Sequence, residues 1–325
     1  MGGSVKALVT GGGGFIGSNL VERLLAEGYD VRVLDNFATG DRENLKHLLG
    51  EIELVEGDIQ SYERVHNAVV GRELVFHLAA LPSVPRSIQD PLTSNATNVI
   101  GTLNVLLASR DAGVQRIVYA SSSSLYGPTL DLPKREDMPL LPIAPYAVSK
   151  LAGEGYCRSF TQVYGLDTVA LRYFNVFGPR QDPLSQYAAV IPRFVMAFQE
   201  DRSPVVFGNG EQSRDFTYVD NAVDANLRAA LANDVAGEAF NIACGERISL
   251  NEILAELREL TGKEIVADYS DARPGEVPHS LADISKARQA LSYEPAVNVR
   301  QGLRTVFEWY TERRRLIEEA PTRPT

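Results

Sequence analysis

The stretch TGGGGFIG, Thr10 to Gly17, follows a short apolar segment and precedes one whose apolar residues recur at helical spacing. Its glycines at positions 11, 14 and 17 let the chain turn tightly and bring backbone N–H groups against a pyrophosphate. The N-terminus of the following helix adds partial positive charge at the same place. A glycine-rich loop alone is a weak signal, but its strand–loop–helix context predicts a dinucleotide-binding unit.

An acidic residue follows at the spacing that such a unit requires. Asp35 ends the next predicted strand, Asp30 to Asp35, about 20 residues after the loop. A carboxylate there accepts both ribose hydroxyls of adenosine and repels a 2′-phosphate, which favours NAD over NADP. Arg32 and Arg42 are interpreted as members of surface salt bridges.

Asp58, which follows the apolar segment LVEG, has two interpretations. It is placed to meet the adenine end of the cofactor. It could instead cap the helix predicted to begin in SYERV, since an aspartate often precedes a first helical turn. The sequence leaves both open.

Strands and helices alternate through the first half of the chain. Strands are predicted at Ser4–Thr10, Asp30–Asp35, Ile52–Asp58, Glu73–Ala80 and Gln115–Ser122, with helices between them. The strands are nearly all apolar, which is typical of a parallel sheet covered on both faces. The fold class predicted is therefore α/β, a Rossmann-like doubly wound parallel sheet.

The pattern changes after about Gly178, where short strands such as PVVFG and AFNIA are separated by helices. Residues 1–178 are expected to form the NAD-binding domain with the catalytic residues. Residues 179–325 are expected to form mainly a smaller C-terminal α/β substrate-binding region, with some late segments returning to the first domain. The proline-bearing segment Asp271–Ser280 is predicted to be a loop.

Composition excludes several classes of protein. The 325 residues carry a net charge of −10 and no basic face, so no nucleic-acid partner is expected. Two cysteines far apart, Cys157 and Cys244, indicate a reducing compartment without disulfides. Neither a leader segment nor a long apolar run is apparent, and we expect a cytoplasmic protein without a membrane partner. The four histidines lack metal-ligand spacing, so no metal is expected.

The segment PYAVSKLAGEGYC, Pro145 to Cys157, places Tyr146 four residues before Lys150. Residues at that spacing share a helix face, although an aromatic residue and a cation often occur so by chance. Here the pair follows the strand ending in SSSSLYG, at the edge of the sheet where ligands bind. A nearby ammonium and a cationic nicotinamide ring would favour the phenolate and lower the Tyr146 pKa, which predicts a base for a sugar hydroxyl.

Six ordered motifs together carry a family resemblance: TGGGGFIG, HLAA, SSSSLYG, PYAVSK, RYFNVFGPRQDP and RDFTYVD. The chain resembles the extended short-chain dehydrogenase/reductase family from Lys6 to about Tyr310. Within that family it is most similar to UDP-hexose 4-epimerases, and among these to the branch that acts on N-acetylated sugars.

The resemblance implies catalytic roles for three residues, Ser122, Tyr146 and Lys150. Tyr146 would take the proton from the sugar O4 while the hydride leaves C4 for NAD, and the resulting 4-keto sugar would rotate and be reduced on its other face. Lys150 would hold the nicotinamide ribose, Ser122 would share the proton path, and Ser121 would be structural.

The resemblance and the loop spacing together imply two sets of binding residues. Those expected to bind NAD are Gly11, Gly14, Phe15, Ile16, Gly17, Asp35, Asn36, Asp58, Ile59, Leu78, Ala79, Ala80, Asn98, Tyr146, Lys150 and Tyr173. Those expected to bind the UDP-sugar are Ser83, Arg86, Ser123, Ser124, Asn175, Gln186, Tyr187, Ala189, Val190, Phe207, Arg214, Arg273 and Ser280. Arg214 and Arg273 would clamp the diphosphate and nucleoside ribose, unless they belong to surface ion pairs.

Related reactions are distinguished by what the site lacks. Sugar 4,6-dehydratases carry an Asp-Glu pair where this chain has Ser123 and Ser124, and UDP-glucuronate decarboxylases carry a Glu in this stretch. Epimerisation needs no such acid. A UDP-glucuronate 4-epimerase, another nucleotide-sugar oxidoreductase of this family and, more remotely, a non-catalytic NAD-sensing protein remain as alternatives.

Two further expectations come from the resemblance. Ser280 aligns with the gatekeeper beside the sugar C2 substituent, where a small side chain leaves room for an N-acetyl group. Activity is therefore expected on UDP-N-acetylglucosamine and UDP-N-acetylgalactosamine, with UDP-glucose and UDP-galactose also accepted. The helices around Gly101–Asp111 and Tyr146–Phe160 are expected to pair in a homodimer.

Overall fold

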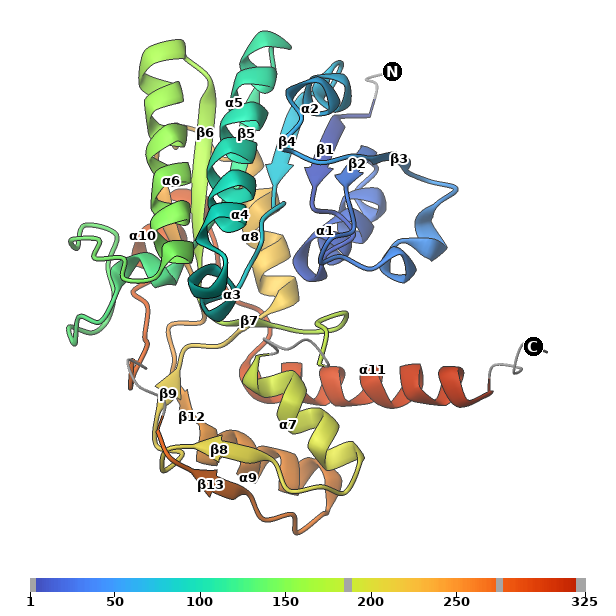
Figure 1. Cartoon of the computed structure of the whole chain (residues 1–325), viewed down its shortest axis with the longest axis vertical. Coiled ribbons are helices and arrows are strands. Elements are labelled where there is room, and N and C mark those ends of the chain that lie inside the picture. Colours follow the sequence, from blue (N-terminus) through green and yellow to red (C-terminus); the bar gives the residue numbers. More distant parts are fainter. Residues whose placement is uncertain (1–3, 184–188, 273–276, 320–325) are drawn as a thin grey trace.

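The computed structural model describes residues 4–183, 189–272 and 277–319, and a seven-stranded parallel sheet lies at its centre (Figure 1). The strand order is β11-β6-β5-β4-β1-β2-β3. These strands are β1 Lys6–Thr10, β2 Asp30–Asp35, β3 Glu53–Glu56, β4 Leu74–His77, β5 Arg116–Ser122, β6 Asp167–Tyr173 and β11 Ala239–Ile242. The predicted fold class is confirmed, and Asp30–Asp35 was predicted with the observed bounds.

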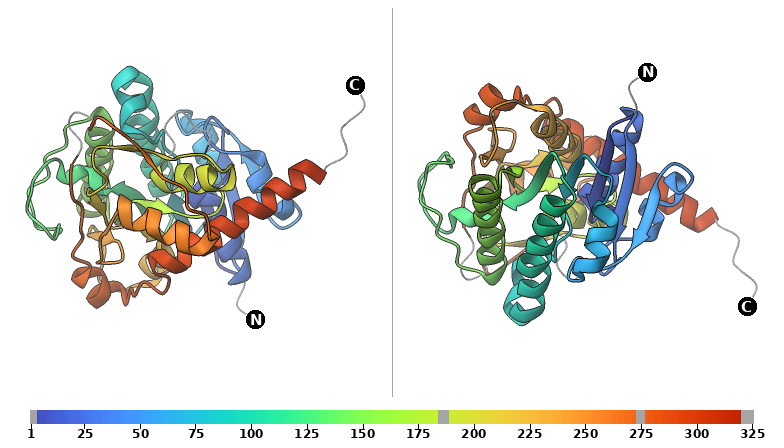
Figure 2. Two further views of the ribbon diagram at one scale, coloured as in Figure 1. Left: turned by 90° about the horizontal axis from the view of Figure 1, so that it is seen from below. Right: turned by 90° about the horizontal axis from the view of Figure 1, so that it is seen from above.

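Helices cover both faces of this sheet, which is why its central strands are apolar throughout. α1 and α8 pack together on one face, and α2, α5 and α6 lie on the other (Figures 1 and 2). Each face has its own set of buried apolar side chains. The helices around the sheet are α1 Phe15–Ala26, α2 Tyr62–Val69, α3 Val84–Gln89, α4 Pro91–Asn95, α5 Thr102–Asp111, α6 Pro145–Tyr164, α8 Val219–Leu231 and α10 Ser285–Leu291.

Later segments build a smaller body below the carboxyl ends of the strands (Figure 1). It holds three two-stranded sheets, β10-β7, β12-β9 and β13-β8, with helices packed beside them. Its elements are β7 Val176–Phe177, α7 Val190–Gln199, β8 Val205–Phe207, β9 Ser213–Arg214, β10 Thr217–Tyr218, β12 Ile248–Ser249, α9 Leu250–Thr261, β13 Asp268–Ser270 and α11 Val299–Glu319. The strand β11 returns to the large sheet beside β6.

The position of the site follows from the strand order. β1 pairs with β2 on one side and with β4 on the other, so the connections leave it in opposite directions. A crevice forms at such a switch point, outside the carboxyl ends of the strands. The loop after β1 and the segment after β4 both lie there. Over the described residues, no helix is long and apolar enough to cross a membrane.

Candidate cofactor and catalytic site

The loop Thr10–Gly17 forms a cradle that only glycine fits. Gly11 has a φ of +74°, and a Cβ on it would lie 2.7 Å from the backbone N of Ala79. A Cβ on Gly17 would lie 2.1 Å from the carbonyl oxygen of Gly11. Gly14 is the N-cap of α1, no side chain caps that helix, and its first turn, beginning Phe15-Ile16, holds no acidic residue. The helix N-terminus therefore presents uncapped N–H groups suited to a phosphate.

Asp35 is buried against this loop at the end of β2. One carboxylate oxygen accepts the N–H of Gly13 at 2.8 Å and the other accepts the N–H of Phe37 at 2.7 Å. Burial raises the pKa of Asp35, and these hydrogen bonds oppose that rise. The carboxylate lies where the loop-and-acid pattern predicted it.

Asn36 and Asp58 extend the same edge. The Asn36 amide donates to Asp58 Oδ2 at 2.9 Å. The alternative role of Asp58 as a helix cap is wrong, because Ser61 is the N-cap of α2 and accepts from the Arg64 N–H.

Both predicted salt bridges are present, but only that of Arg42 lies on the surface, because the Arg32 side chain is largely buried. Arg32 pairs with Glu53 at 2.8 Å, and Arg42 pairs with Glu56 at 2.6 Å. Both arginines therefore have carboxylate partners on β3, the strand next to β2. Neither guanidinium is needed to explain the cofactor cradle.

Asn98 joins the segment after β4 to α6. It lies in the π-helical turn Ala96–Gly101 and is 1 % exposed. Its side chain accepts from Leu81 N at 2.7 Å and donates to Ser149 Oγ at 3.0 Å, which fixes the end of the stretch Leu78-Ala79-Ala80. Ile59 is buried against Gly101, on which a Cβ would lie 2.6 Å from the Ile59 side chain.

Tyr146, Ser122 and Lys150 are brought together at the carboxyl end of β5. Tyr146 is the second residue of α6, and its backbone N donates to Ser87 Oγ at 3.0 Å. The Ser122 side chain hydrogen-bonds with that of Tyr146 and lies 2.9 Å from Ser124 Oγ. Lys150, 4 % exposed, donates from Nζ to the Ala120 carbonyl at 2.8 Å.

The side chains around Tyr146 do not supply the lowering of its pKa that was predicted from Lys150, and the contribution predicted from the nicotinamide ring stays a prediction. Burial raises the pKa of Tyr146, and the hydrogen bond with Ser122 only partly opposes this. Lys150 is not among the groups that shift this pKa, and its ammonium donates to the Ala120 carbonyl. Burial lowers the pKa of Lys150 to about 8.

The other serines of SSSSLYG differ in role. Ser121 donates to Glu154 Oε2 at 2.8 Å, in agreement with its predicted structural role. Ser123 and Ser124 begin the 3-10 turn Ser123–Tyr126 directly after β5.

The predicted residues Ser83 and Arg86 belong to α3. Ser83 has a φ of +104° and caps that helix by accepting the Arg86 N–H. The backbone strain of a non-glycine residue at positive φ is therefore held beside the end of β4.

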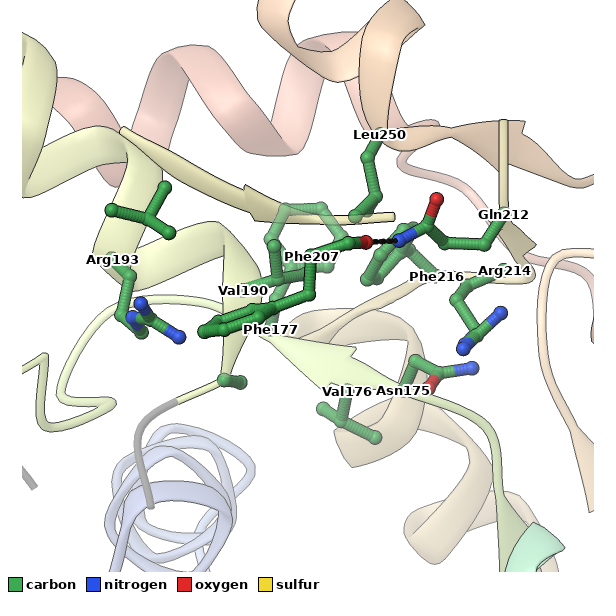
Figure 3. Close-up of a pocket in the computed structure, with 12 residues that line it drawn as sticks. Asn175, Val176, Phe177, Val190, Arg193, Phe207, Gln212, Arg214, Phe216 and Leu250 are labelled. Carbon is green, nitrogen blue, oxygen red and sulfur yellow. Dashed lines mark hydrogen bonds between the residues drawn. The ribbon is translucent and has the colours of Figure 1, made fainter. Parts of the chain in front are cut away.

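A cavity of about 270 Å³ lies in the C-terminal body (Figure 3). Five predicted substrate residues line it: Asn175, Ala189, Val190, Phe207 and Arg214. Sequence reasoning missed seven others: Val176, Phe177, Arg193, Val205, Gln212, Phe216 and Leu250. Phe177 and Phe216 lie within the quoted motifs RYFNVFGPRQDP and RDFTYVD, so their neighbourhood gave a signal, whereas Leu250 gave none.

The ends of this cavity carry different groups. At one end, Arg214 and Asn175 lie close together, and at the other the Arg193 guanidinium is 5.9 Å from the ring centre of Phe207 (Figure 3). Arg214 donates to the carbonyls of Ser213 and Pro278, each at 3.0 Å. Asn175, with a φ of +39°, donates to the Asp215 carbonyl at 2.9 Å.

Other predicted residues lie elsewhere. The Ser280 N–H donates to the Ser213 carbonyl at 3.0 Å, so Ser280 is beside β9 without lining the cavity. The Tyr173 hydroxyl is paired with buried Asn226, at 2.7 Å from its Nδ2. Gln186, Tyr187 and Arg273 lie outside the described residues.

Comparisons with known proteins agree with this geometry. Residues 7–243 match the model of the NAD dependent epimerase/dehydratase family. A putative UDP-glucose 4-epimerase from Methanocaldococcus jannaschii is 38% identical over 306 residues, which cover 93% of this chain and 97% of that protein.

Two solved structures have the same fold over nearly their whole length. A UDP-N-acetylglucosamine 4-epimerase from Methanobrevibacter ruminantium, in complex with UDP-N-acetylmuramic acid, has a TM-score of 0.92 and 38% identity, covering 96% of this chain and all of that one (100%). A UDP-glucuronic acid 4-epimerase from Bacillus cereus, in complex with UDP-glucuronic acid and NAD, has a TM-score of 0.88 and 32% identity, covering 95% and 99%.

Proposed function

The chain belongs to the NAD dependent epimerase/dehydratase family, and we propose that it interconverts UDP-hexoses that differ in configuration at C4. The observation that carries this proposal is the hydrogen-bonded pair Tyr146–Ser122 beside Lys150, at the carboxyl end of β5. Proton transfer to and from a sugar hydroxyl needs such a group beside a hydride carrier.

The residues of the cradle fit NAD. Gly11 and Gly17 admit no side chain, and the uncapped start of α1 suits a pyrophosphate. Asp35, at the end of β2, would accept the adenosine ribose hydroxyls, and Asp58 would continue that edge. Because Asp35 is a carboxylate, this edge disfavours the 2′-phosphate of NADP.

The catalytic residues move one proton in each half-reaction. When bound, NAD supplies the hydride acceptor that later returns the hydride. Tyr146 takes the proton from the C4 hydroxyl as the 4-keto sugar forms, and gives it back when the other face of C4 is reduced. Ser122 shares the proton path through its hydrogen bond with Tyr146. Lys150, one turn further along α6, would hold the nicotinamide ribose.

The cavity supports recognition of the nucleotide part of the substrate. Arg214 presents a guanidinium for the diphosphate, and Phe207 with its apolar neighbours offers a surface for the base. Ser280 remains the proposed gatekeeper, and its small side chain leaves room for an N-acetyl group. We therefore propose turnover of UDP-N-acetylglucosamine and UDP-N-acetylgalactosamine, with UDP-glucose and UDP-galactose also accepted.

A UDP-glucuronate 4-epimerase is the second candidate, supported by the likeness to the Bacillus cereus enzyme. Such an enzyme uses the same proton transfer. Its substrate differs from UDP-glucose only at C6, which carries a carboxylate. A nucleotide-sugar oxidoreductase of this family would have to exchange NAD at every turnover, whereas an epimerase can keep it bound.

The domain division and the oligomer are part of the same proposal. Residues 1–178 would bind NAD, and residues 179–325 would mainly bind substrate, with β11 and α8 returning to the sheet. A homodimer would cover apolar side chains exposed on α6, namely Val148, Val163 and Tyr164, at 51%, 67% and 51% exposure. The cytoplasmic location stays a prediction from cysteine usage.

The experiment that tests the function is product analysis with protein as purified and no added NAD. UDP-N-acetylglucosamine, UDP-glucose and UDP-glucuronic acid are supplied in parallel, and the 4-epimer of the first is expected. Turnover of UDP-glucuronic acid alone would move the protein to the second candidate, and no 4-epimer from any of the three would refute the proposal.

A single substitution tests the gatekeeper. Ser280→Tyr should abolish turnover of UDP-N-acetylglucosamine while retaining that of UDP-glucose, because the larger ring would fill the space beside C2. Ser280→Ala is the control and should turn over both substrates. Equal turnover of both by the Tyr variant would place the gatekeeper elsewhere.

A further inference from the structure

A series of buried hydrogen bonds connects the cofactor loop with the catalytic helix, and His77 is at its centre. His77 ends β4 and is 1 % exposed. Its Nδ1 lies 2.7 Å from Thr10 Oγ1, and its Nε2 lies 2.9 Å from Thr102 Oγ1. Both hydroxyls are buried, so each hydrogen must find a protein acceptor.

The contacts of Thr102 fix the proton on Nε2. The Thr102 hydroxyl donates to the carbonyl of Asn98 at 2.6 Å. A carbonyl only accepts, so the single hydroxyl hydrogen of Thr102 is used there. Thr102 must then accept from His77, and Nε2 carries the hydrogen.

The contacts of Thr10 leave Nδ1 without a proton. Thr10 Oγ1 accepts the backbone N–H of Ala79 at 3.3 Å, and its own hydrogen is free to bond to His77 Nδ1. A cationic ring would direct a second N–H at this oxygen and deprive the Thr10 hydrogen of its acceptor.

The charges around the ring favour the same neutral form. Lys150 from α6 is the cation that faces His77, and Tyr119 from β5 packs with its ring centre 5.7 Å away. Burial and the Lys150 ammonium lower the pKa of His77 to about 3.

The two ends of the series both lie in the proposed site. Thr10 directly precedes Gly11, the first glycine of the cradle. Asn98, held by Thr102, donates to Ser149 Oγ at 3.0 Å, and Ser149 donates to the Tyr146 carbonyl at 2.8 Å. A displacement at His77 would therefore reach both the cofactor loop and the start of α6.

We propose that His77 is a positioning residue, held as the neutral tautomer with hydrogen on Nε2, that fixes the cofactor loop and Asn98 relative to Tyr146. The inference rests on the proposed function for its catalytic consequence. An apolar side chain could fill the same space, but it could not both accept from the Thr10 hydroxyl and donate to the Thr102 hydroxyl.

The tautomer can be observed directly by nitrogen-15 NMR of the histidine-labelled protein. The chain has four histidines, so the spectrum is simple, and the signal lost in His77→Gln identifies His77. We expect an Nε2–H tautomer that does not titrate between about pH 5 and 8, the range in which an unperturbed histidine changes charge. An Nδ1–H tautomer, or titration in that range, would overturn the assignment.

The positioning role is tested at Thr102, with a matched control. Thr102→Val removes the acceptor of His77 and should lower kcat and the retention time of NAD by about tenfold or more, with the UDP-sugar KM within about twofold. Thr102→Ser keeps the hydroxyl and should restore both values. Thr168→Val is the control. It removes an equally buried hydroxyl that donates to the Cys157 carbonyl near the amino end of β6, and it should leave kcat and the retention time of NAD unchanged.

The outcomes separate this inference from the proposed function. Loss of NAD retention in the Thr102 variant, with serine rescue, supports the inference whichever sugar is the substrate. Unchanged NAD retention and kcat in Thr102→Val, or an equal loss in Thr168→Val, would refute it. Failure of all three sugars with the unaltered protein would refute the function but leave the tautomer and retention tests valid.

Discussion

Tyr146 carries a phenol whose neutral form is favoured by burial, so its neighbours must supply what makes it a base. In the structure, the Ser122 hydroxyl is the group that opposes the rise in pKa, whereas Lys150 is turned to the Ala120 carbonyl. The spacing of Lys150 from Tyr146 in the sequence therefore says less about the Tyr146 pKa than the position of the Lys150 ammonium in the structure.

Tyr146→Phe tests this residue. The variant should lose about 10²- to 10⁴-fold in kcat, the range attributed to one acid–base group, because only the proton-transferring oxygen is removed. Bound NAD, measured after denaturation, and UDP-sugar affinity, measured by calorimetry, should stay close to the unaltered protein. Tyr62→Phe, which removes a hydroxyl bonded to Asp111 on the surface, is the control. Retained activity in the Tyr146 variant would exclude this residue as the base.

At the scale of the element, the first turn of α1 depends on backbone packing that no side chain can enter. Gly17→Ala would drive a Cβ to 2.1 Å from the Gly11 carbonyl, so the loop must move and NAD binding should fall by about tenfold or more. Gly50→Ala is the matched control, since its Cβ would meet nothing within 4 Å. The measurement is NAD affinity of the apo-protein. Equal affinity in both variants would show that the loop is not the cradle.

Asp215 holds three segments together between β9 and β10. Its carboxyl oxygens accept the N–H groups of Cys244, Gly245 and Ala282 at 2.9, 3.1 and 3.2 Å, and the last is two residues beyond Ser280. Burial raises the pKa of Asp215 from 3.8 to about 7, opposed by these backbone hydrogen bonds. The carboxyl group therefore connects β11 to the segment that bears the proposed gatekeeper.

This pKa gives stability a pH dependence of known sign. Between pH 4 and 7 the folded protein keeps a proton on Asp215 that the unfolded chain releases, so the free energy of unfolding falls as pH rises. From pH 5 to 7 the fall should be about 2 kcal/mol larger in the unaltered protein than in Asp215→Asn, which cannot titrate. Urea unfolding at the two pH values measures the difference. A pH-independent difference would mean that the carboxylate is already ionised at pH 5.

At the scale of the whole molecule, apolar side chains remain exposed on α6, on the opposite face of the sheet from α8. A second copy of the chain would bury them, and the proposed homodimer predicts a sedimenting mass of twice 35.6 kDa.

Val163→Glu should convert this dimer to monomers, because it places a charge among the apolar side chains of the interface. Leu231→Glu, at the end of α8 and of matching exposure (66% against 67%), should leave the mass unchanged. Sedimentation at micromolar concentration is the measurement. A monomeric unaltered protein, or an unchanged mass in the Val163 variant, would contradict this interface.

Prediction from sequence succeeded where the signal is local. The loop Thr10–Gly17, the strand Asp30–Asp35 and the helix around Tyr146–Phe160 each follow from glycine geometry, a short apolar run or helical spacing within a short window. The interpretation of Asp58 as a cap was wrong because Ser61 competed for the same helix end. Leu250 was missed, since it has no local signal and lines the cavity only after the C-terminal body has folded.

The sequence by itself determined the α/β class and the glycine loop, because periodicity and turn chemistry are properties of neighbouring residues, whereas Ser122, Tyr146 and Lys150 were predicted to be catalytic from motif spacing and the family resemblance. Only the tertiary structure decided that β11 closes the sheet beside β6, that Lys150 Nζ donates to the Ala120 carbonyl, and that His77 joins Thr10 to Thr102. Thr10 and His77 are 67 residues apart, and burial and hydrogen-bond direction depend on such distant partners.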